Sequence, residues 1–144
     1  MELDHVVLAD IVSPRPDGKI DLYGVGWDTI ISPTVPAMHP RMDLAIRFLL
    51  SAQEVETSHH VAVTLMGADG QLARIDADVA PLPPETRATI QAGRRVGIGI
   101  ILTLAGVTFP DYGAYSIVIT WDGTEVRDPL RLFVSPMPGA PPQA

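Results

Sequence analysis

The stretch MDLAIRFLLSA, residues 42–52, alternates apolar side chains with polar or smaller ones at a period of two. Successive side chains of a strand point to opposite faces, so this pattern predicts a β-strand with one buried face. It is the clearest strand in the sequence. The face predicted to be buried carries Met42, Leu44, Ile46, Phe48 and Leu50, and the opposite face carries Asp43, Ala45, Arg47 and Ser51.

Downstream of it, residues 60–66 and 71–79 alternate in the same way, with Ala68-Asp69-Gly70 between them. Asp-Gly between two alternating runs predicts a hairpin, because glycine accepts the positive φ of a tight turn. Asp122-Gly123 repeats this signal and is expected to join a strand over residues 114–121 to a last strand near residues 126–134.

Residues 95–104 form a further strand pattern, in which Gly97 and Gly99 lie opposite the apolar face. Small residues there indicate that something packs closely or that the strand bends. Its apolar face carries Val96, Ile98, Ile100, Leu102 and Leu104. Residues 5–12 and 19–25 predict two more strands, joined across residues 13–18.

Helical signals are confined to residues 84–93, which fit either one short helix or a loop with an edge strand. We therefore predict an all-β fold, an antiparallel β-sandwich (Ig-like or jelly-roll-like) of about eight or nine strands with at most one short helix. A closed barrel is the alternative. Residues 1–134 are expected to form a single domain and residues 135–144 a disordered, proline-rich tail.

The composition excludes several classes of function. The net charge is −7, and the ten basic residues, of which only Lys19 is a lysine, form no sustained cluster, so neither nucleic acid nor a membrane is expected as a partner. Cysteine is absent, which excludes thiolate chemistry. The acidic N-terminus lacks the pattern of a secretion signal, so a cytoplasmic location is expected. The preference for arginine over lysine is typical of a GC-rich bacterial genome.

The segment GVGW, residues 24–27, contains a Gly-x-Gly, but Thr29 stands where a dinucleotide-binding motif has its third glycine and strand-like residues follow. We interpret the two glycines as a bend, with Trp27 packed at the edge of the core. If the segment lies in an open cleft, Trp27, Asp28 and His39 are candidate binding residues.

Histidine supplies the plausible metal ligands, at His5, His39, His59 and His60. His59 and His60 are adjacent in a strand and should point to opposite faces, so we predict no metal site. No serine-hydrolase elbow, zinc-protease helix or phosphate loop occurs, and the acids fall at turns or at outward, solvated strand positions such as Asp43, Asp76 and Asp78. We accordingly predict no catalytic residue, no cofactor and no enzymatic activity.

In the stretch FPDYGAYSIVITWDG, residues 109–123, Tyr115 enters a strand where its hydroxyl can bond back to the preceding loop. Tyr112, Trp121 and Trp27 are candidates for an aromatic platform that binds a sugar, with Tyr112 as the binding residue of this segment. Trp121 is in register with Ile117 and Ile119, which favours a place in the core.

These segments together resemble a family of small bacterial all-β proteins known as a domain of unknown function. The shared motifs are Leu8-Ala9-Asp10, Gly18-Lys19, Gly-x-Gly-Trp at 24–27, Pro-x-x-Pro at 33–36 and Pro-x-x-Gly-x-Tyr at 110–115. The resemblance covers nearly all of the chain except the tail. Where other members usually carry a proline after the central strand, this chain has Ser51-Ala52-Gln53. The resemblance implies a β-sandwich and brings no activity, cofactor or catalytic residue.

The absence of a catalytic motif favours a non-enzymatic binding or assembly module that contacts another protein or a second copy of itself. Leu49, Ile101 and Phe133, on outward strand positions, are the predicted contact residues if they are exposed. A small-ligand or carbohydrate-binding module is the alternative, with aromatic residues at a cleft between loops. A metal-dependent enzyme of cupin-like shape is a third possibility, which requires at least two of the histidines and an acid to converge.

Overall fold

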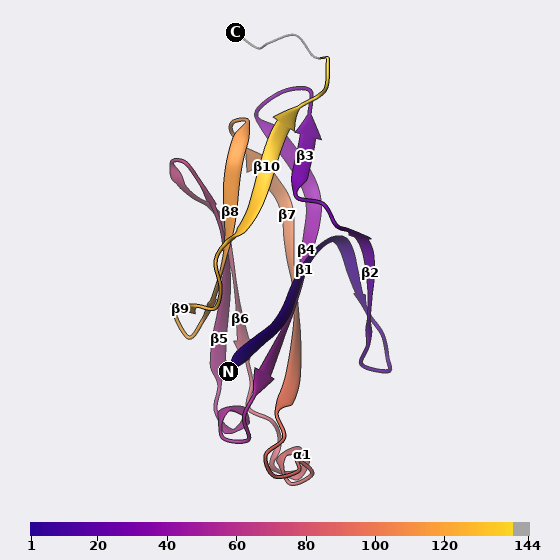
Figure 1. Ribbon diagram of the computed structural model, residues 1–144, viewed down its shortest axis with the longest axis vertical. Coiled ribbons are helices and arrows are strands. Elements are labelled where there is room, and N and C mark those ends of the chain that lie inside the picture. Colours follow the sequence, from indigo (N-terminus) through magenta and orange to yellow (C-terminus); the bar gives the residue numbers. More distant parts are fainter. Residues whose placement is uncertain (140–144) are drawn as a thin grey trace.

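The computed structural model describes residues 1–139 and contains two β-sheets that lie face to face (Figure 1). The first sheet, sheet A, has the order β2 (Ile20–Val25), β1 (Glu2–Pro14), β4 (Ala37–Leu50) and β7 (Val96–Phe109). The second, sheet B, has the order β3 (Thr29–Ser32), β10 (Leu130–Pro136), β8 (Gly113–Trp121), β5 (His59–Gly67) and β6 (Gly70–Val79), with β9 (Thr124–Glu125) also paired to β8.

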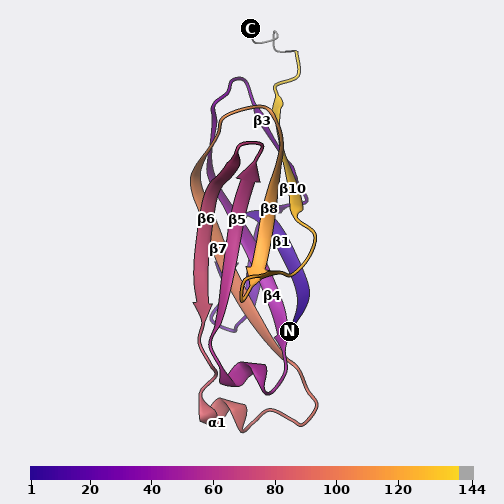
Figure 2. The ribbon, with the colours of Figure 1, turned by 90° about the vertical axis from the view of Figure 1, so that its left-hand side faces the viewer.

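All strand pairs are antiparallel except β10 with β3. Figure 2 looks onto sheet B and shows β6, β5, β8 and β10 side by side in front of sheet A. The predicted all-β fold of two mostly antiparallel sheets is confirmed, and within residues 1–139 the sheets stay separate, so the closed-barrel alternative is wrong. The ten strands exceed the predicted number because β3 and β9 are short.

Within residues 1–139, helical structure is limited to α1 (Pro84–Arg87) and a single 3₁₀ turn, η1 (Glu54–Glu56). α1 occupies the start of the predicted segment at residues 84–93 and connects β6 to β7 at the lower end of the molecule (Figure 2). Neither segment has the length and apolar character that a helix needs to cross a bilayer.

The core lies between the sheets and is formed by the apolar faces that the alternation predicts. The five apolar residues of β4 are at most 2% exposed and share one cluster with Val61, Val63 and Leu65 of β5 and with Ile117 and Ile119 of β8. In β7, the apolar residues predicted to share one face point towards the core as far as Leu104. Gly106, at φ 62°, then reverses the alternation, so that Val107 and Phe109 point into the core.

The glycines of GVGW form the predicted bend where the chain crosses from β2 in sheet A to β3 in sheet B. Gly24 and Gly26 have φ of 66° and 86°, which side chains other than glycine rarely adopt. A methyl group at Gly24 would also collide with the carboxylate of Asp10. The Trp27 indole N–H donates to the Gly24 carbonyl at 2.7 Å, and its ring packs against the core. The bend is therefore closed by its own tryptophan.

The β1–β2 hairpin projects beyond the rest of sheet A. β1 pairs with β4 only as far as Ala9, and from there residues 10–25, here called the arm, turn out of the plane and hang beside the lower halves of β4 and β7 (right side of Figure 1). Val12 of the arm packs against Ala9, Ala45 and Ile101 on the outer face of sheet A. The arm thus covers part of a sheet face that would otherwise meet water.

Asp43 lies beneath the arm and is fully buried, so the prediction of a solvated position is wrong for this residue. Its carboxylate accepts hydrogen bonds from the Val12 amide at 2.8 Å and from Arg41 Nε and Nη2 at 3.1 and 2.8 Å. Burial raises the pKa of Asp43, but the hydrogen bonds from Arg41, Val12 and Thr103 hold it below its ordinary value. The alternation placed Asp43 on the outer face correctly; it could not show that the arm covers that face.

The C-terminal boundary also differs from the prediction. β10 continues to Pro136, and Ser135 and Pro136 pair with Ile31 and Ser32 of β3. The sheet therefore extends two positions into the segment predicted as a tail. Proline is accepted there because the last position of a strand need not donate a ladder hydrogen bond. Residues 140–144 of the predicted tail lie outside the described residues.

Replacement of Asp43 by alanine is expected to lower the free energy of unfolding by about 2–4 kcal/mol, because the Val12 amide and Arg41 lose a charged partner at a buried position. Asp43→Asn keeps an acceptor and should lose less. Urea unfolding of both variants measures the effect, with Asp128→Ala, at an exposed position, as the control that stays within about 0.5 kcal/mol. An Asp43→Ala protein as stable as the control would contradict this account of the arm.

Candidate functional site

The four residues predicted to bind a ligand are only partly brought together. The rings of Trp27 and His39 lie 5.6 Å apart, centroid to centroid. The Asp28 carboxylate accepts from the Thr29 hydroxyl at 2.8 Å, and the Asp28 carbonyl accepts from the Phe133 amide of β10. Tyr112 is at the other end of β3, where its hydroxyl donates to the Ser32 carbonyl at 3.0 Å. The four side chains thus line the two ends of β3 rather than one cleft.

His39 retains one unusual feature. Its Nε2 atom is buried and has no hydrogen-bond partner among residues 1–139. The contact with Trp27 covers the imidazole, so the ring takes part in packing the upper end of the core.

Trp121 and Tyr115 have structural roles. Trp121 is 6% exposed, with its ring centroid 4.7 Å from that of Phe48 and 4.6 Å from that of His59. The sugar platform therefore lacks one of its three predicted rings. The Tyr115 hydroxyl donates to the Asp111 carbonyl at 2.7 Å and accepts from the Asp111 amide at 3.2 Å, which confirms the predicted bond back to the loop.

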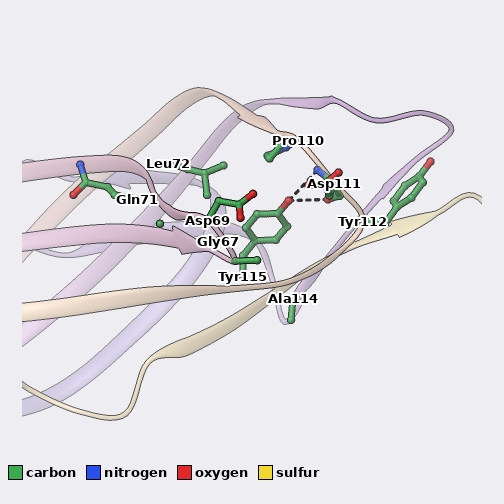
Figure 3. Close-up of a pocket in the computed structure, with 11 residues that line it drawn as sticks. Gly67, Asp69, Gln71, Leu72, Pro110, Asp111, Tyr112, Ala114 and Tyr115 are labelled. Atoms are coloured by element: carbon green, nitrogen blue, oxygen red, sulfur yellow. Dashed lines mark hydrogen bonds between the residues drawn. The ribbon is translucent and has the colours of Figure 1, made fainter.

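A small hollow opens beside Tyr115, between the β5–β6 hairpin and the β7–β8 connection (Figure 3). Its volume is about 200 Å³, below the range of roughly 300–1,000 Å³ usual for ligand pockets. Leu72 and Gly67 border it together with Asp69, and Figure 3 shows Tyr112 at the far side of the connection, away from Leu72. The Tyr115 hydroxyl is already occupied by Asp111, so the hollow offers a ligand little beyond two carboxylates at its rim.

His59 and His60 point to opposite faces of β5, as predicted. On the outer face, His60 holds Asp78 at 2.8 Å through Nδ1 and Asp76 at 2.7 Å through Nε2. Both ring nitrogens donate only in the imidazolium, so the hydrogen bonds to Asp78 and Asp76 raise the pKa of His60. Arg74 and His60 together lower the pKa of Asp76 to about 2.

On the inner face, His59 bonds Asp122 at 2.7 Å through Nδ1 and the Glu54 carbonyl at 2.7 Å through Nε2. Burial lowers the pKa of His59, but these two hydrogen bonds raise it above its ordinary value. His5 lies elsewhere, 3.4 Å from the Asp4 carboxylate. In the part of the chain that the structure describes, no three histidine, aspartate or glutamate side chains are arranged to hold a metal ion.

Within residues 1–139, the arm carries five of the nine exposed large apolar side chains, and the three contact residues that the sequence indicated are not among the nine. Leu49, Ile101 and Phe133 are all partly buried, so the prediction that they form an exposed contact surface is not met. On the arm, Ile11, Tyr23 and Val25 are 44%, 56% and 50% exposed. Ile20 and Leu22, which alternate with Tyr23 and Val25 along β2, are each 38% exposed. The sequence carried this signal, because residues 20–25 are apolar on both faces of the strand instead of one.

Beneath the arm, a cleft of about 620 Å³ separates the hairpin loop from the outer face of sheet A. The loop contributes Pro14, Arg15, Gly18, Lys19 and Ile20. The sheet contributes His5, Ala45, Ile46, Arg47, Gly97, Gly99, Ile100 and Ile101. We call this space the arm cleft. In the sequence, Gly97 and Gly99 indicate either close packing or a bend of the strand, and no local pattern shows that the hairpin loop comes to lie over them.

A family model described as a family of unknown function (DUF6941) matches residues 4–134. No curated protein matches the chain.

The stability of the protein is expected to fall as the pH rises above 6.5, the ordinary pKa of histidine. The raised pKa of His60 means that the folded state gains stability from the imidazolium, fully present below pH 6.5 and lost as the pH rises through the folded-state pKa. His60→Asn should make the urea concentration at the unfolding midpoint vary less between pH 6 and pH 9. The pH dependence that comes from His59 should remain in this variant. A His60 pKa at or below 6.5, measured by NMR titration of the ring protons, would contradict the double ion pair.

Proposed function

The chain belongs to the family of unknown function DUF6941, and from that premise we propose that it is a non-enzymatic binding module that contacts another protein through the arm. Family membership confirms the resemblance seen in the motifs and assigns no activity. The observation that carries the proposal is the exposure of five apolar side chains on one projecting hairpin, at Ile11, Ile20, Leu22, Tyr23 and Val25.

The backbone of β2 supports the same proposal. β2 is the edge strand of sheet A. Val12 and Leu22 are paired, and the Val12 amide donates to Asp43, away from β2. In an antiparallel pair of this kind both residues direct their amides and carbonyls outward, so the Leu22 N–H and C=O face the open edge. Natural proteins usually protect such edges with lysine, proline or a cover, and partners often add a strand to an unprotected one.

The charge of the chain favours a different protein over a second copy as this partner. Two copies that each carry −7 repel one another at a distance. Within the arm, Asp21 is 3.7 Å from Arg15 and Asp17 is 3.0 Å from it, which reduces the charge beside the edge. We therefore infer that the partner presents a neutral or basic extended segment with alternating apolar side chains.

The proposed absence of catalysis is supported by the surroundings of the groups with shifted pKa values. His60 and Asp76 are bonded to each other and to Asp78 and Arg74 on an open sheet face, and His59 is held at a strand end. Ion pairs of this kind perturb pKa values without performing chemistry. The sugar-binding alternative has less support, because Trp121 is in the core and Tyr112 is apart from Trp27.

A photocrosslinking amino acid at position 23 is expected to form a discrete adduct with another protein in cells, because Tyr23 is central to the exposed patch. The same amino acid at position 38 is the control, since Met38 is 64% exposed but outside the arm. Leu22→Pro should abolish the adduct and keep the β1–β2 ladder, because the backbone N–H that it removes is the outward one, and it also removes one apolar side chain of the patch. No adduct at position 23, adducts equal at both positions, or an adduct with a second copy of the chain would each count against the proposal.

A further inference from the structure

The arm cleft is a second surface created by the arm and shares only Ile20 with the exposed patch: Ile11, Leu22, Tyr23 and Val25 are not among its lining residues. Its volume of about 620 Å³ falls within the range of roughly 300–1,000 Å³ for small-molecule sites. Apolar surface comes from both walls, with Pro14 and Ile20 on the arm and Ile101 on the sheet.

The charged groups of the arm cleft are all basic. Arg15, Lys19 and Arg47 line it, and no aspartate or glutamate does, although the chain as a whole carries −7. Arg47 is bound to Asp4 at 2.5 Å and Arg15 to Asp17 at 3.0 Å. The Lys19 ammonium forms no ion pair within residues 1–139, while its backbone amide is fixed by Asp17 at 3.1 Å. The one lysine of the sequence thus offers an uncompensated cation at the mouth of the cleft.

Gly97 and Gly99 form part of the sheet wall of the cleft and differ in what they contact. A methyl group at Gly97 would collide with the guanidinium of Arg47, the far end of a flexible side chain, which would have to shift to make room. At Gly99 a methyl group would meet no atom within 4 Å. Neither residue has a positive φ, so the backbone does not require glycine at either position.

Glycine inside a strand lowers stability, and a ligand that approaches the backbone closely is a recognised reason for it. Since no contact within residues 1–139 requires glycine at position 99, we infer that the space above it is used by a molecule outside the chain. The neighbouring cations and apolar walls define the chemistry of that molecule.

We propose that the arm cleft binds a small organic anion with an apolar body, such as an alkyl or aryl carboxylate or phosphate monoester. The anionic head group pairs with Lys19 and Arg15 at the hairpin loop. The apolar body lies over Gly99 and between Ile20 and Ile101. The site is independent of the protein contact on the arm, so either assignment stands if the other fails.

Isothermal titration calorimetry with octanoate and with octyl phosphate tests the proposal and separates the two head groups. At least one is expected to bind the wild-type protein, more weakly as salt is raised, whereas inorganic phosphate and 1-octanol, which each lack one half of the ligand, should not bind. Lys19→Gln is expected to weaken binding at least tenfold. Arg131→Gln, which removes one positive charge from an exposed position of β10, is the matched control and should bind as the wild type does.

Gly99→Val provides a second, structural test. Valine is favoured in an extended strand and its Cβ meets no atom of the chain within 4 Å here, so the variant should unfold at the same temperature as the wild type or higher, yet lose binding. Ala105→Val, at an exposed position of β7 outside the cleft, is the control that keeps binding. Amide NMR shifts on adding the ligand should concentrate at residues 15–20 and 97–101.

The proposal is overturned if neither amphiphile binds, or if Lys19→Gln and Gly99→Val bind as the wild type does. Equal affinity for inorganic phosphate would overturn the role of the apolar body. An acidic peptide that binds more tightly than both amphiphiles would overturn the assignment to a small molecule.

Discussion

The hydrogen bond from the Val12 amide to the Asp43 carboxylate holds the structure together at the point where β1 leaves β4. Up to Ala9, β1 satisfies its backbone by pairing with β4; beyond it, the strand turns away and its inner amides would be left without partners. The Asp43 carboxylate on sheet A accepts the hydrogen bond from Val12 that a paired strand would otherwise accept. Arg41 balances its charge from a partly exposed position, and the arm shields the Asp43 carboxylate from water. Removing any of the three leaves the other two in an unfavourable setting.

Two surfaces follow from that single attachment. Because the arm is fixed over the outer face of sheet A, one of its sides stays exposed with Tyr23 and Val25, and a cleft remains between its loop and the sheet. The exposed apolar residues and the unprotected edge of β2 both carry a risk of aggregation. A hairpin that only had to complete a sandwich would lie flat in the sheet, without either feature.

The sequence predicted those parts of the fold that depend on near neighbours. Alternation gave the buried face of β4, Asp-Gly gave the hairpin turns, and the position of Tyr115 before a strand gave its bond to the loop. Contacts between distant segments were beyond such patterns. The burial of Asp43 depends on Val12, thirty-one residues away in sequence, and the parallel pairing of β10 with β3 joins residues 133–136 to residues 29–32. These two long-range contacts do not change the alternation of apolar and polar residues in the segments that form them.

The two glycines of β7 show how structure separates reasons that look identical in sequence. Gly97 and Gly99 are both small residues on the outward face of the same strand, and alternation treats them alike. The guanidinium of Arg47 occupies the space above Gly97. The space above Gly99 is empty of protein and belongs to a cleft lined by three basic residues, of which Lys19 alone has no ion pair within residues 1–139. A residue that costs stability without serving any contact of its own chain is evidence of an interaction with another molecule, and at Gly99 the surrounding charges indicate that this molecule is an anion.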